Sequence, residues 1–352
     1  MKALVYHGNG KKQWETMADP KILRDTDAII RVDSSTICGT DLHILEGGVP
    51  WIAPGRILGH EGTGTVLEVG RGTSSLAVGD RVLCKCVASC GKCRYCRSGQ
   101  FGQCVDEEGG WMLGGKADGV QAEYARIAHA DNSLVKVPQD MSDEQVIYLS
   151  DIMVTGFEVG VLRANVQPGE TVVVVGAGPV GLSTMAVARL YSPATIIAVE
   201  LSPARRDVAR SFADIVVSPE EALAAVHSAT DGLGADVAIE AVGRAKTFEH
   251  CCELVRVGGR VANIGLHSHP ATLHLETLWL KEITITTGIP NHRTAHILLK
   301  AIKSGVLDPT KLTSHRYASL HDMMKAYEVF EHPAETNAMK ILLGSGACCG
   351  NG

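Results

Sequence analysis

Four cysteines with short spacings give the chain its clearest chemical signal. They are Cys90, Cys93, Cys96 and Cys104. A structural zinc site needs four soft ligands around one ion, and spacings this short let a single loop supply all of them as thiolates. A nucleic-acid-binding zinc ribbon uses similar ligands, but no basic, aromatic-rich patch accompanies them here. The segment therefore predicts a loop folded around one structural zinc ion.

Cys38 and His60, upstream of this loop, are candidate ligands of a second zinc site. A catalytic zinc has three protein ligands and keeps one position open. No cysteine occurs between Cys104 and Cys251, so a third ligand from the segment between them must be a histidine or a carboxylate. Asp151 lies there in an otherwise apolar helical pattern, where an unpaired carboxylate is costly. We predict that Asp151 completes this ligand set.

Three alternatives stay open at this second site. Asp151 could instead form a hydrogen bond to a helix of a neighbouring domain. In that case Glu61 or His129 would be the better third ligand. Because Glu61 follows His60 directly, it could also serve as an exchangeable fourth ligand or as a group that supports the ligands.

A glycine-rich turn farther along the chain predicts a site for a dinucleotide. Residues 176–181 read Gly-Ala-Gly-Pro-Val-Gly, follow a run of valines and open a helical pattern, which is the context that this fingerprint requires. Gly176 permits the tight turn, Gly178 lets the backbone approach a pyrophosphate, and Gly181 lets the helix pack on the strand. The helix N-terminus then offers free amides and a positive dipole to the phosphates.

Glu200 indicates which dinucleotide binds. It lies nineteen residues beyond Gly181, at the end of the next apolar strand pattern. A carboxylate at that place accepts hydrogen bonds from the ribose hydroxyls and repels a 2′-phosphate, so we predict NAD rather than NADP. Arg205 and Arg206 follow closely and are the counter-argument, since an arginine can accommodate a 2′-phosphate.

The length of 352 residues is too large for one ordinary core and predicts two domains. The first part carries short β patterns broken by glycines, which is typical of an antiparallel, barrel-like domain. Farther along, apolar strands alternate with helical patterns, which predicts an α/β domain with a doubly wound parallel sheet of the Rossmann type. One helix from Ser142 toward Ala164 is expected to link the two.

We place the catalytic, zinc-binding domain at 1–152 and 293–352, and the cofactor domain at 153–292. The strands expected in the cofactor domain are Thr171–Val175, Thr195–Val199, Ile215–Val217, Val237–Glu240, Arg260–Ile264 and Ile283–Thr287.

The composition argues against several classes of partner. Hydrophobic residues make up 45% and charged residues 20% of the chain, as in ordinary globular proteins. A formal net charge of -6 offers no electrostatic attraction to nucleic acid or to an anionic membrane. The N-terminus has no apolar signal core, and eleven cysteines without such a signal favour metal ligation in a reducing cytoplasm. We therefore expect a cytoplasmic protein without nucleic-acid or membrane partners. We assign no function to Cys348 and Cys349 in the glycine-rich tail.

Taken together, the motifs resemble those of the zinc-containing alcohol dehydrogenases of the medium-chain dehydrogenase/reductase superfamily. The similarity covers nearly the whole chain: Cys-Gly-Thr-Asp-Leu-His at 38–43, Gly-His-Glu at 59–61, the four-cysteine loop, the glycine turn, Asp-Val-Ala-Ile-Glu-Ala-Val-Gly at 236–243 and Met-Lys-Ile-Leu at 339–342. It implies a GroES-like first domain, with one catalytic and one structural zinc per chain. It also implies reversible hydride transfer between a primary or secondary alcohol and NAD, and a homo-oligomer, either a tetramer or a dimer.

Asp151 is a departure from the commonest form of that family. Its members can hold the catalytic zinc with two cysteines and one histidine, whereas Asp151 stands where the second cysteine would be. In this respect the chain resembles the bacterial secondary-alcohol branch, and Trp111 falls where that branch has a tryptophan in the substrate pocket. Members of that branch often lack the structural zinc and often use NADP. Here all four cysteines are present and Glu200 indicates NAD.

The resemblance also implies roles for the remaining site residues. The zinc would act as a Lewis acid toward the alcohol oxygen. Thr40 would take the proton from that oxygen, His43 would carry it outward, and Glu61 would act beside the ligands. The residues implied to contact the cofactor are Gly176, Gly178, Pro179, Val180, Gly181, Glu200, Arg205, Thr155, Val242 and Lys340.

Two other functions fit parts of the pattern. One is a polyol or threonine dehydrogenase of the same superfamily. Its substrate would bring additional polar groups, against which Trp111 and the apolar segment 49–52 argue. The other, from a different class, is a catalytically silent, nucleotide-binding zinc protein. Such a protein would have no need of an open metal site with Thr40 and His43 beside it.

Overall fold

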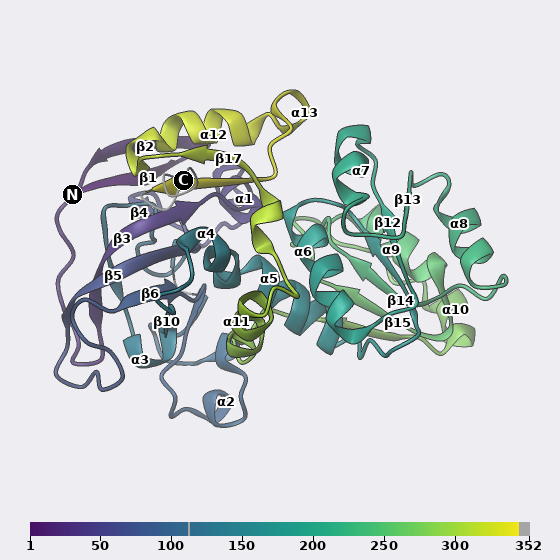
Figure 1. The fold of residues 1–352 in the computed structure, drawn as a ribbon, viewed down its shortest axis with the longest axis horizontal. Coiled ribbons are helices and arrows are strands. Elements are labelled where there is room, and N and C mark those ends of the chain that lie inside the picture. The colour runs from purple at the N-terminus through teal and green to yellow at the C-terminus, as the bar shows by residue number, and fades with distance from the viewer. Residues whose placement is uncertain (112, 345–352) are drawn as a thin grey trace. The chain divides into compact units, whose positions relative to one another are not determined.

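The computed structural model describes residues 1–111 and 113–344. The pair Cys348 and Cys349 lies outside the described residues. The chain forms two compact units, one of Met1–Asp151 with Pro290–Gly352 and one of Ile152–Ile289. In Figure 1 the second unit contains the teal and green strands β11 to β16. Each unit has its own sheets.

The first unit is built mainly from antiparallel strands. A three-stranded sheet has the order β2-β1-β4, and a larger sheet has the order β10-β6-β5-β3-β18-β17, with β9 also paired to β3. Within these two sheets only β17 and β18 run parallel. The predicted antiparallel first domain is confirmed. The strands are β1 (Lys2–Gly8), β2 (Lys11–Thr16), β3 (Ala28–Thr36), β4 (Arg56–Ile57), β5 (Gly62–Val69), β6 (Arg81–Cys84), β9 (Tyr124–Ile127), β10 (Leu134–Lys136), β17 (Thr313–Tyr317) and β18 (Lys340–Gly344).

The C-terminal part of the chain closes the core of this first unit. Strand β18 pairs with β3, far earlier in the chain, and places Ile341 and Leu343 among buried residues such as Ile30. Helix α12 (Met323–Glu331) adds Tyr327, whose side chain is fully buried. Burying these apolar side chains is the main force that ties the two distant segments together.

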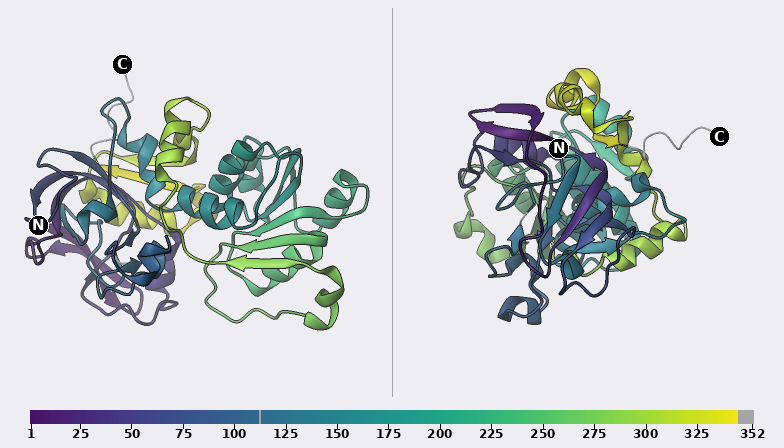
Figure 2. Two further views of the ribbon diagram at one scale, coloured as in Figure 1. Left: turned by 90° about the horizontal axis from the view of Figure 1, so that it is seen from below. Right: turned by 90° about the vertical axis from the view of Figure 1, so that its left-hand side faces the viewer.

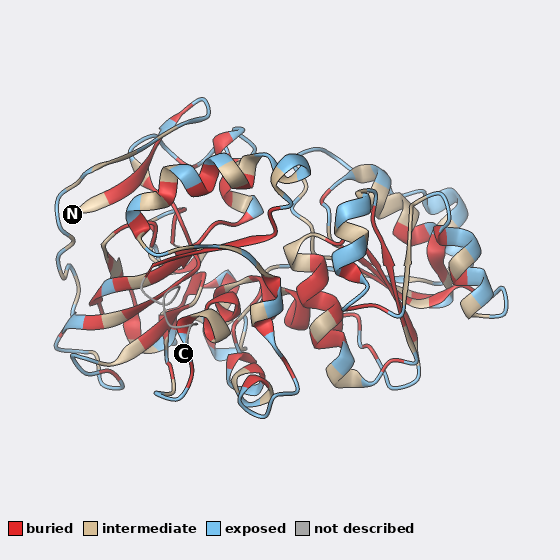
Figure 3. Ribbon diagram, turned by 45° about the horizontal axis from the view of Figure 1, so that its top comes forward, coloured by how far each residue is buried: buried red, intermediate tan, exposed pale blue. Residues whose placement is uncertain are grey.

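The second unit contains a six-stranded parallel sheet. Its order is β13-β12-β11-β14-β15-β16, which is the Rossmann order when the strands are counted along the chain. The residues of β11 are buried along its whole length, as the continuous red of the central strands in Figure 3 shows. The predicted doubly wound α/β domain is confirmed. The strands are β11 (Thr171–Val175), β12 (Thr195–Val199), β13 (Ile215–Val217), β14 (Ala235–Glu240), β15 (Val255–Asn263) and β16 (Thr284–Thr287).

Helices cover both faces of this sheet (Figures 1 and 2). On one face, Ala238 of β14 packs in a cluster with Val226 of α8 (Ala222–Ala229) and Cys251 of α9 (Ala245–Leu254). Ile239, the next residue, faces the other side, where a side chain added at Gly160 would meet it at 3.7 Å. That alternation is the period of two that a strand imposes.

The strand register gathers three chain segments at one edge of the parallel sheet. Val175 at the end of β11 pairs with Val199 of β12 and with Glu240 of β14. The segments that follow, beginning at Gly176, Glu200 and Ala241, therefore leave the same carboxyl edge. In doubly wound sheets, ligands bind at that edge where the strand order reverses, which here is between β11 and β14.

The single helix that we expected from Ser142 toward Ala164 is wrong. The segment forms four short pieces: α4 (Asp143–Val146), η2 (Ile147–Ser150), α5 (Ile152–Thr155) and the π-helix η3 (Gly156–Leu162). Asp151 interrupts them with φ −149° and ψ −76°, outside the helical region. In the described part of the chain, no single helix is long and apolar enough to cross a membrane, and 143–150 with 152–162 pass that test only as a bent pair.

Candidate metal centres and nucleotide site

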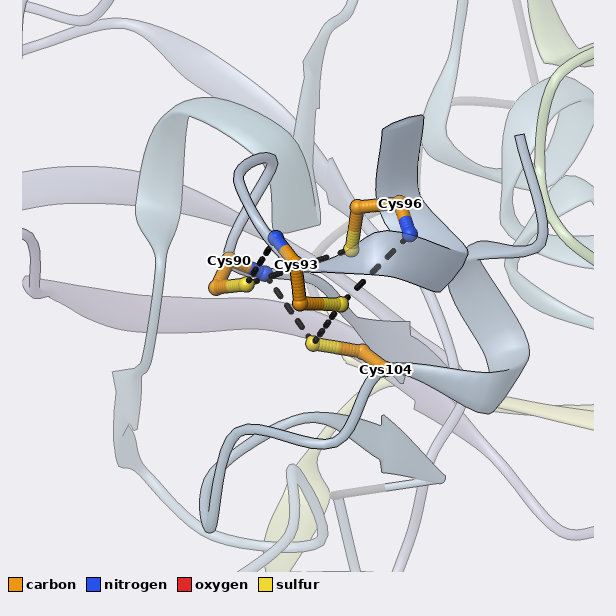
Figure 4. A group of neighbouring side chains, drawn as sticks. All are labelled: Cys90, Cys93, Cys96 and Cys104. Carbon is orange, nitrogen blue, oxygen red and sulfur yellow. Dashed lines mark hydrogen bonds between the residues drawn. The ribbon is translucent and has the colours of Figure 1, made fainter. Parts of the chain in front are cut away.

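The four-cysteine loop forms a closed ligand set. One ligand atom of each cysteine lies within 4.8 Å of the others, and Figure 4 shows the four side chains converging from one loop. Backbone N–H groups of the loop donate to the sulfurs: Cys93 to Cys90 Sγ (3.4 Å), Cys96 to Cys93 Sγ (3.5 Å) and Cys90 to Cys104 Sγ (3.3 Å). The amide of Cys96, followed by that of Val105, lowers the pKa of Cys93 to about 6. The set fits a tetrahedral zinc ion held by thiolates.

Cys38, His60 and Asp151 form a second ligand set. One ligand atom from each lies within 4.8 Å of the others. Asp151 Oδ2 is 3.3 Å from His60 Nε2 and 3.9 Å from Cys38 Sγ. Cys38 and His60 are buried, whereas the Asp151 side chain keeps 16% of its surface exposed. Three ligands of sulfur, nitrogen and oxygen type, with access for a further group, match a catalytic zinc site rather than a structural one.

The local backbone explains how two of these ligands are held. Cys38 is the N-cap residue of α1 (Gly39–Leu45), so its position is set by the start of that helix. His60 follows Gly59, which has φ +95°. A side chain at Gly59 would also meet Gln121 Cγ at 2.5 Å. Only glycine adopts this positive φ without strain and leaves room for Gln121. The turn at Gly59 places His60 in the ligand set.

The electrostatics of this second set favour a cation. Burial alone would lower the pKa of His60, but the hydrogen bond to Asp151 and the interaction with Cys38 outweigh it, and the pKa lies well above its ordinary value. These contacts thus favour the protonated, positively charged imidazole when no metal is bound. A zinc ion would replace that positive charge, so the residues present fit the metal.

The glycine turn has the geometry expected of a phosphate-binding loop. Gly176 has φ +101°, and a side chain at Gly181 would come within 1.9 Å of the Gly176 carbonyl oxygen. Gly178 is the N-cap of α6 (Pro179–Ala188), and a side chain there would meet only Arg205 Nη1, at 3.7 Å. The turn therefore leaves its backbone accessible to a pyrophosphate at the start of a helix.

Glu200 and the two arginines near it have different surroundings. Glu200 is buried, and its carboxylate accepts hydrogen bonds from the backbone N–H groups of Ala177 (2.7 Å) and Ser202 (2.8 Å). Arg206 Nη1 donates to the carbonyl oxygens of Glu200 (3.0 Å) and Leu201 (2.9 Å). Arg205 instead lies beside Gly178. Of the two arginines, Arg205 is the one next to the phosphate-binding turn.

Comparisons with known proteins agree with this geometry. Residues 24–139 match the family model "Alcohol dehydrogenase GroES-like domain" and residues 179–301 match "Zinc-binding dehydrogenase". An alcohol dehydrogenase of Cupriavidus necator is 34% identical over 97% of this chain and 98% of its own. The chain belongs to the zinc-dependent alcohol dehydrogenases.

Two further relatives show the range of this family. The solved structure of the apo form of zinc dependent alcohol dehydrogenase 2 from Streptococcus pneumonia is 45% identical, with a TM-score of 0.93 and 98% of each chain covered. An L-threonine 3-dehydrogenase of Pyrococcus horikoshii is 34% identical over 86% of this chain and 87% of its own. Family membership therefore leaves the substrate of this alcohol dehydrogenase to be identified from its own residues.

Asp41 is a site residue of the dehydrogenase that the sequence analysis missed. Its Oδ2 accepts from the backbone N–H of Cys38 (2.9 Å) and from Gln121 Nε2 (3.1 Å). Its Oδ1 lies 3.7 Å from His60 Nδ1, within ion-pair range, and neither atom has a hydrogen-bond partner. Burial raises the pKa of Asp41, while the charge of His60 opposes this shift. A carboxylate behind a ligating imidazole fixes its tautomer and orientation. The signal that could have found it is the Asp three residues after Cys38.

Glu61 and Lys340 form a buried ion pair. Lys340 Nζ contacts Glu61 Oε2 and donates to the carbonyl oxygen of Ile37 (3.1 Å), and both charged side chains are almost completely buried. Glu61 Oε1 has no hydrogen-bond partner. Burial raises the pKa of Glu61, and the ammonium of Lys340 opposes that shift. The cofactor contact expected of Lys340 stays a prediction, whereas its contact with Glu61 connects β18 to the residue after His60.

The remaining predicted residues of the first unit lie at different depths. Thr40 Oγ1 is 3.7 Å from Cys38 Sγ, so it lies beside the ligand set. The His43 side chain, on the same helix, is 26% exposed and lies 4.0 Å from Glu46 Oε2. His129, the alternative third ligand, pairs with Asp106 at 3.0 Å instead. It does not belong to either ligand set found among the described residues.

Trp111 lies at the edge of the open ligand set. Its ring meets that of His60 edge-on, with 6.2 Å between ring centroids. Trp51, which is exposed, contacts Trp111 in the same manner at 5.2 Å. The two rings form an apolar surface that leads from solvent to the metal ligand His60.

Proposed function

We propose that this alcohol dehydrogenase carries out reversible hydride transfer between a primary or secondary alcohol and NAD, with Cys38, His60 and Asp151 as ligands of the catalytic metal. The observation that best supports these ligands is the convergence of three suitable donor atoms within 4.8 Å at a partly exposed site. A bound zinc ion would supply a Lewis acid that lowers the pKa of an alcohol hydroxyl, and NAD would accept the hydride.

Residues of this chain would transfer the proton of the alcohol hydroxyl to solvent. Thr40 lies beside Cys38, so its hydroxyl can accept the proton of the substrate hydroxyl while it donates its own. His43 follows on the same helix, is partly exposed and has the side-chain type that titrates near neutral pH, so it can release the proton to solvent. Asp41 would hold the ring of His60 in place throughout.

Glu200 supports NAD rather than NADP as the cofactor. Its buried carboxylate already accepts two backbone N–H groups, so it is held at the carboxyl edge of β12 with lone pairs left for ribose hydroxyls. A hydrogen bond to a charged group contributes about 1.5–3 kcal/mol, which corresponds to roughly one to two powers of ten in kcat/KM. Glu200→Gly should remove most of the preference for NAD, and Arg205 could then favour NADP. A wild-type enzyme that prefers NADP would contradict this assignment.

The experiment that identifies the substrate is a screen in both directions, by NAD reduction and NADH oxidation. It should include primary, secondary and aromatic alcohols with their carbonyl products, and also threonine and polyols. The rings of Trp111 and Trp51 predict higher kcat/KM for apolar or aromatic alcohols. A clear preference for threonine or a polyol would favour the alternative function that the Pyrococcus relative represents. Absence of turnover with zinc and NAD both bound would favour the silent protein.

We also propose that the enzyme is a homo-oligomer, a dimer or a tetramer. Strand β16 ends the parallel sheet, and the preceding segment exposes the large apolar side chains of Leu275, Trp279 and Leu280. Apolar residues gathered beside an edge strand are typical of a surface that another chain covers. Light scattering on the purified enzyme tests this, and a monomer at micromolar concentration would contradict it.

A further inference from the structure

A buried thiol lies against one oxygen of Asp151, and the other two ligands lie against the second oxygen. Cys86, between β6 and β7 (Val87–Ala88), is almost completely buried, and its Sγ lies 3.7 Å from Asp151 Oδ1. The other carboxylate oxygen, Oδ2, is the one that approaches His60 and Cys38. Cys86 and the two other ligands thus approach different oxygens of Asp151.

The backbone around Cys86 strengthens this arrangement. Its N–H donates to the carbonyl oxygen of Ser150 (3.0 Å), the residue before Asp151. The hydroxyl of Ser150 lies 3.2 Å from the backbone nitrogen of Gly62 at the start of β5. Cys86 thus contacts the chain at two points next to the break in the helical segment, where Asp151 has its non-helical backbone.

His292 lies on the other side of this thiol. Its Nε2 is 3.2 Å from Cys86 Sγ, and its side chain is almost completely buried. Burial, followed by the charge of Lys85, lowers the pKa of His292 to about 3, so the ring is neutral and has one N–H. The backbone of His292 has φ 54°, a conformation that non-glycine residues adopt only where their surroundings hold them.

The chemistry of the three groups sets the direction of the two hydrogen bonds. An ionised carboxylate can only accept, so Cys86 must donate its S–H to Asp151 Oδ1. The sulfur can then only accept, so the neutral ring of His292 must carry its proton on Nε2. The chain of donors therefore runs from His292 through Cys86 to Asp151.

We propose that Cys86 is a positioning residue for the catalytic metal: its S–H, oriented by His292, occupies Asp151 Oδ1 so that the carboxylate offers Oδ2 alone to the ion. This inference depends on the proposed role of Asp151 as a ligand. A partner that holds a ligating carboxylate in one orientation typically contributes 10–100-fold to metal affinity or activity. Cys86 itself is not part of the compact ligand set.

The test compares three variants of the full-length enzyme by competition with a chelator for the catalytic zinc. Cys86→Ala should weaken binding of this zinc by roughly 10–100-fold. Cys86→Ser should stay within a few-fold of wild type, because a hydroxyl can donate to Asp151 in the same way. Cys84→Ala is the matched control: Cys84 lies on the same stretch of chain and is fully buried in the apolar core, and its loss should leave the affinity unchanged.

Cobalt substitution at the catalytic site gives a second, spectroscopic readout. Thiolate-to-cobalt charge-transfer absorption should be the same in Cys86→Ser as in wild type, since Cys38 is the only thiolate ligand in the proposal. The ligand-field bands should shift in Cys86→Ala, where Asp151 can turn. If Cys86→Ser lost charge-transfer intensity, Cys86 would be a ligand and the positioning role would be overturned. Unchanged zinc affinity in Cys86→Ala would overturn it as well.

Asp151→Ala separates failure of this inference from failure of the proposed ligand set. If Asp151→Ala weakens zinc binding and Cys86→Ala does not, Asp151 is a ligand without help from Cys86. If Asp151→Ala keeps wild-type affinity, Asp151 is not a ligand and both proposals fail together. With both proposals correct, adding Cys86→Ala to Asp151→Ala should have no further effect, because the two residues act through one interaction. Retention of the four-cysteine zinc and a cooperative thermal transition show that each variant is folded.

Discussion

The two metal centres of the first unit are assembled in opposite ways. In the closed centre, Cys90 and Cys104 are 14 positions apart, and the amides of the same loop stabilise its sulfurs. In the open centre, Cys38 and Asp151 are 113 positions apart, and each ligand depends on a different neighbouring segment. The difference separates two roles. Loss of the closed centre should affect folding, and loss of the open centre should affect chemistry.

Cys38→Ser should have the largest effect on turnover. Removing a ligand of the open centre removes the Lewis acid, whose contribution of several kcal/mol to the transition state corresponds to roughly a thousandfold or more in kcat. The protein should stay folded, because Cys38 Sγ holds no part of the closed loop. Steady-state kinetics with elemental analysis tests this. Near-normal kcat in a chain that has lost one zinc would remove the basis for assigning the open centre to catalysis.

Cys93→Ser should act mainly on stability. Losing a structural metal is among the most destabilising single changes, about 4–5 kcal/mol or more, which lowers the thermal midpoint by roughly 10 °C in a unit of this size. The fraction that remains folded should keep kcat within a few-fold of wild type. Thermal unfolding followed by circular dichroism measures this. An unchanged midpoint, or a single zinc per chain in fully active wild-type enzyme, would contradict the two-centre assignment.

Acid should weaken binding of the catalytic zinc. In the metal-free open centre the pKa of His60 is well above its ordinary value, so zinc must displace a bound proton, and affinity falls about tenfold per pH unit for each proton displaced. The same shift stabilises the metal-free fold. This contribution of His60 to the free energy of unfolding is fully present below the ordinary histidine pKa of about 6.5. It is lost as the pH rises through the higher pKa that His60 has in the folded protein. Competition with a chromogenic chelator at a series of pH values measures the affinity of the catalytic zinc, and an affinity that does not fall as the pH falls would contradict the prediction.

Asp41→Asn should have the smallest effect of the four. The amide keeps the shape of the carboxylate but weakens its hold on His60 Nδ1, which should lower affinity for the catalytic zinc by about tenfold and leave the four-cysteine centre unaffected. Asp19→Asn, at a surface carboxylate that pairs with the N-terminus, serves as control. Chelator competition on both variants gives the comparison. Equal affinities would show that Asp41 supports α1 rather than the metal.

Patterns that repeat over a few residues allowed most of the second unit to be predicted. Strands Thr171–Val175, Thr195–Val199 and Ile215–Val217 are observed with the expected bounds. They are short apolar runs of mostly β-branched residues, the type of run that a strand of a parallel sheet requires. Strand β15 begins at Val255, five residues before the expected start at Arg260. Two glycines, at 258 and 259, interrupt the apolar pattern there. The early part of β15 is a strand because it pairs with β14, where Ala235 is the partner of Val255.

The expected helix around Asp151 shows where such reasoning fails. The apolar pattern from 146 to 161 fits a continuous helix, and sequence periodicity alone gives no reason for a break. In the structure Asp151 leaves the helical region, and its carboxylate meets Cys38, His60 and Cys86 instead. Contacts made by distant segments therefore outweigh the local helical preference.

Residue types and spacing were enough to predict the parts of this dehydrogenase whose members are close together in the chain: the four-cysteine loop, the glycine turn with Glu200 after the next strand, and the strand–helix alternation of the parallel sheet. Residues joined by a short loop can reach only a few partners, so their types and spacing are sufficient to predict which of them come together. The sequence predicted Asp151 as a ligand beside Cys38 and His60 but left alternatives open, and the convergence of the three in the structure favours Asp151. Contacts that only the folded chain reveals are those of Asp41 with His60, of Cys86 with Asp151 and of Lys340 with Glu61. Each of these contacts joins segments brought together by burial of the first unit's core, and no local pattern records which distant segments that core will bring together.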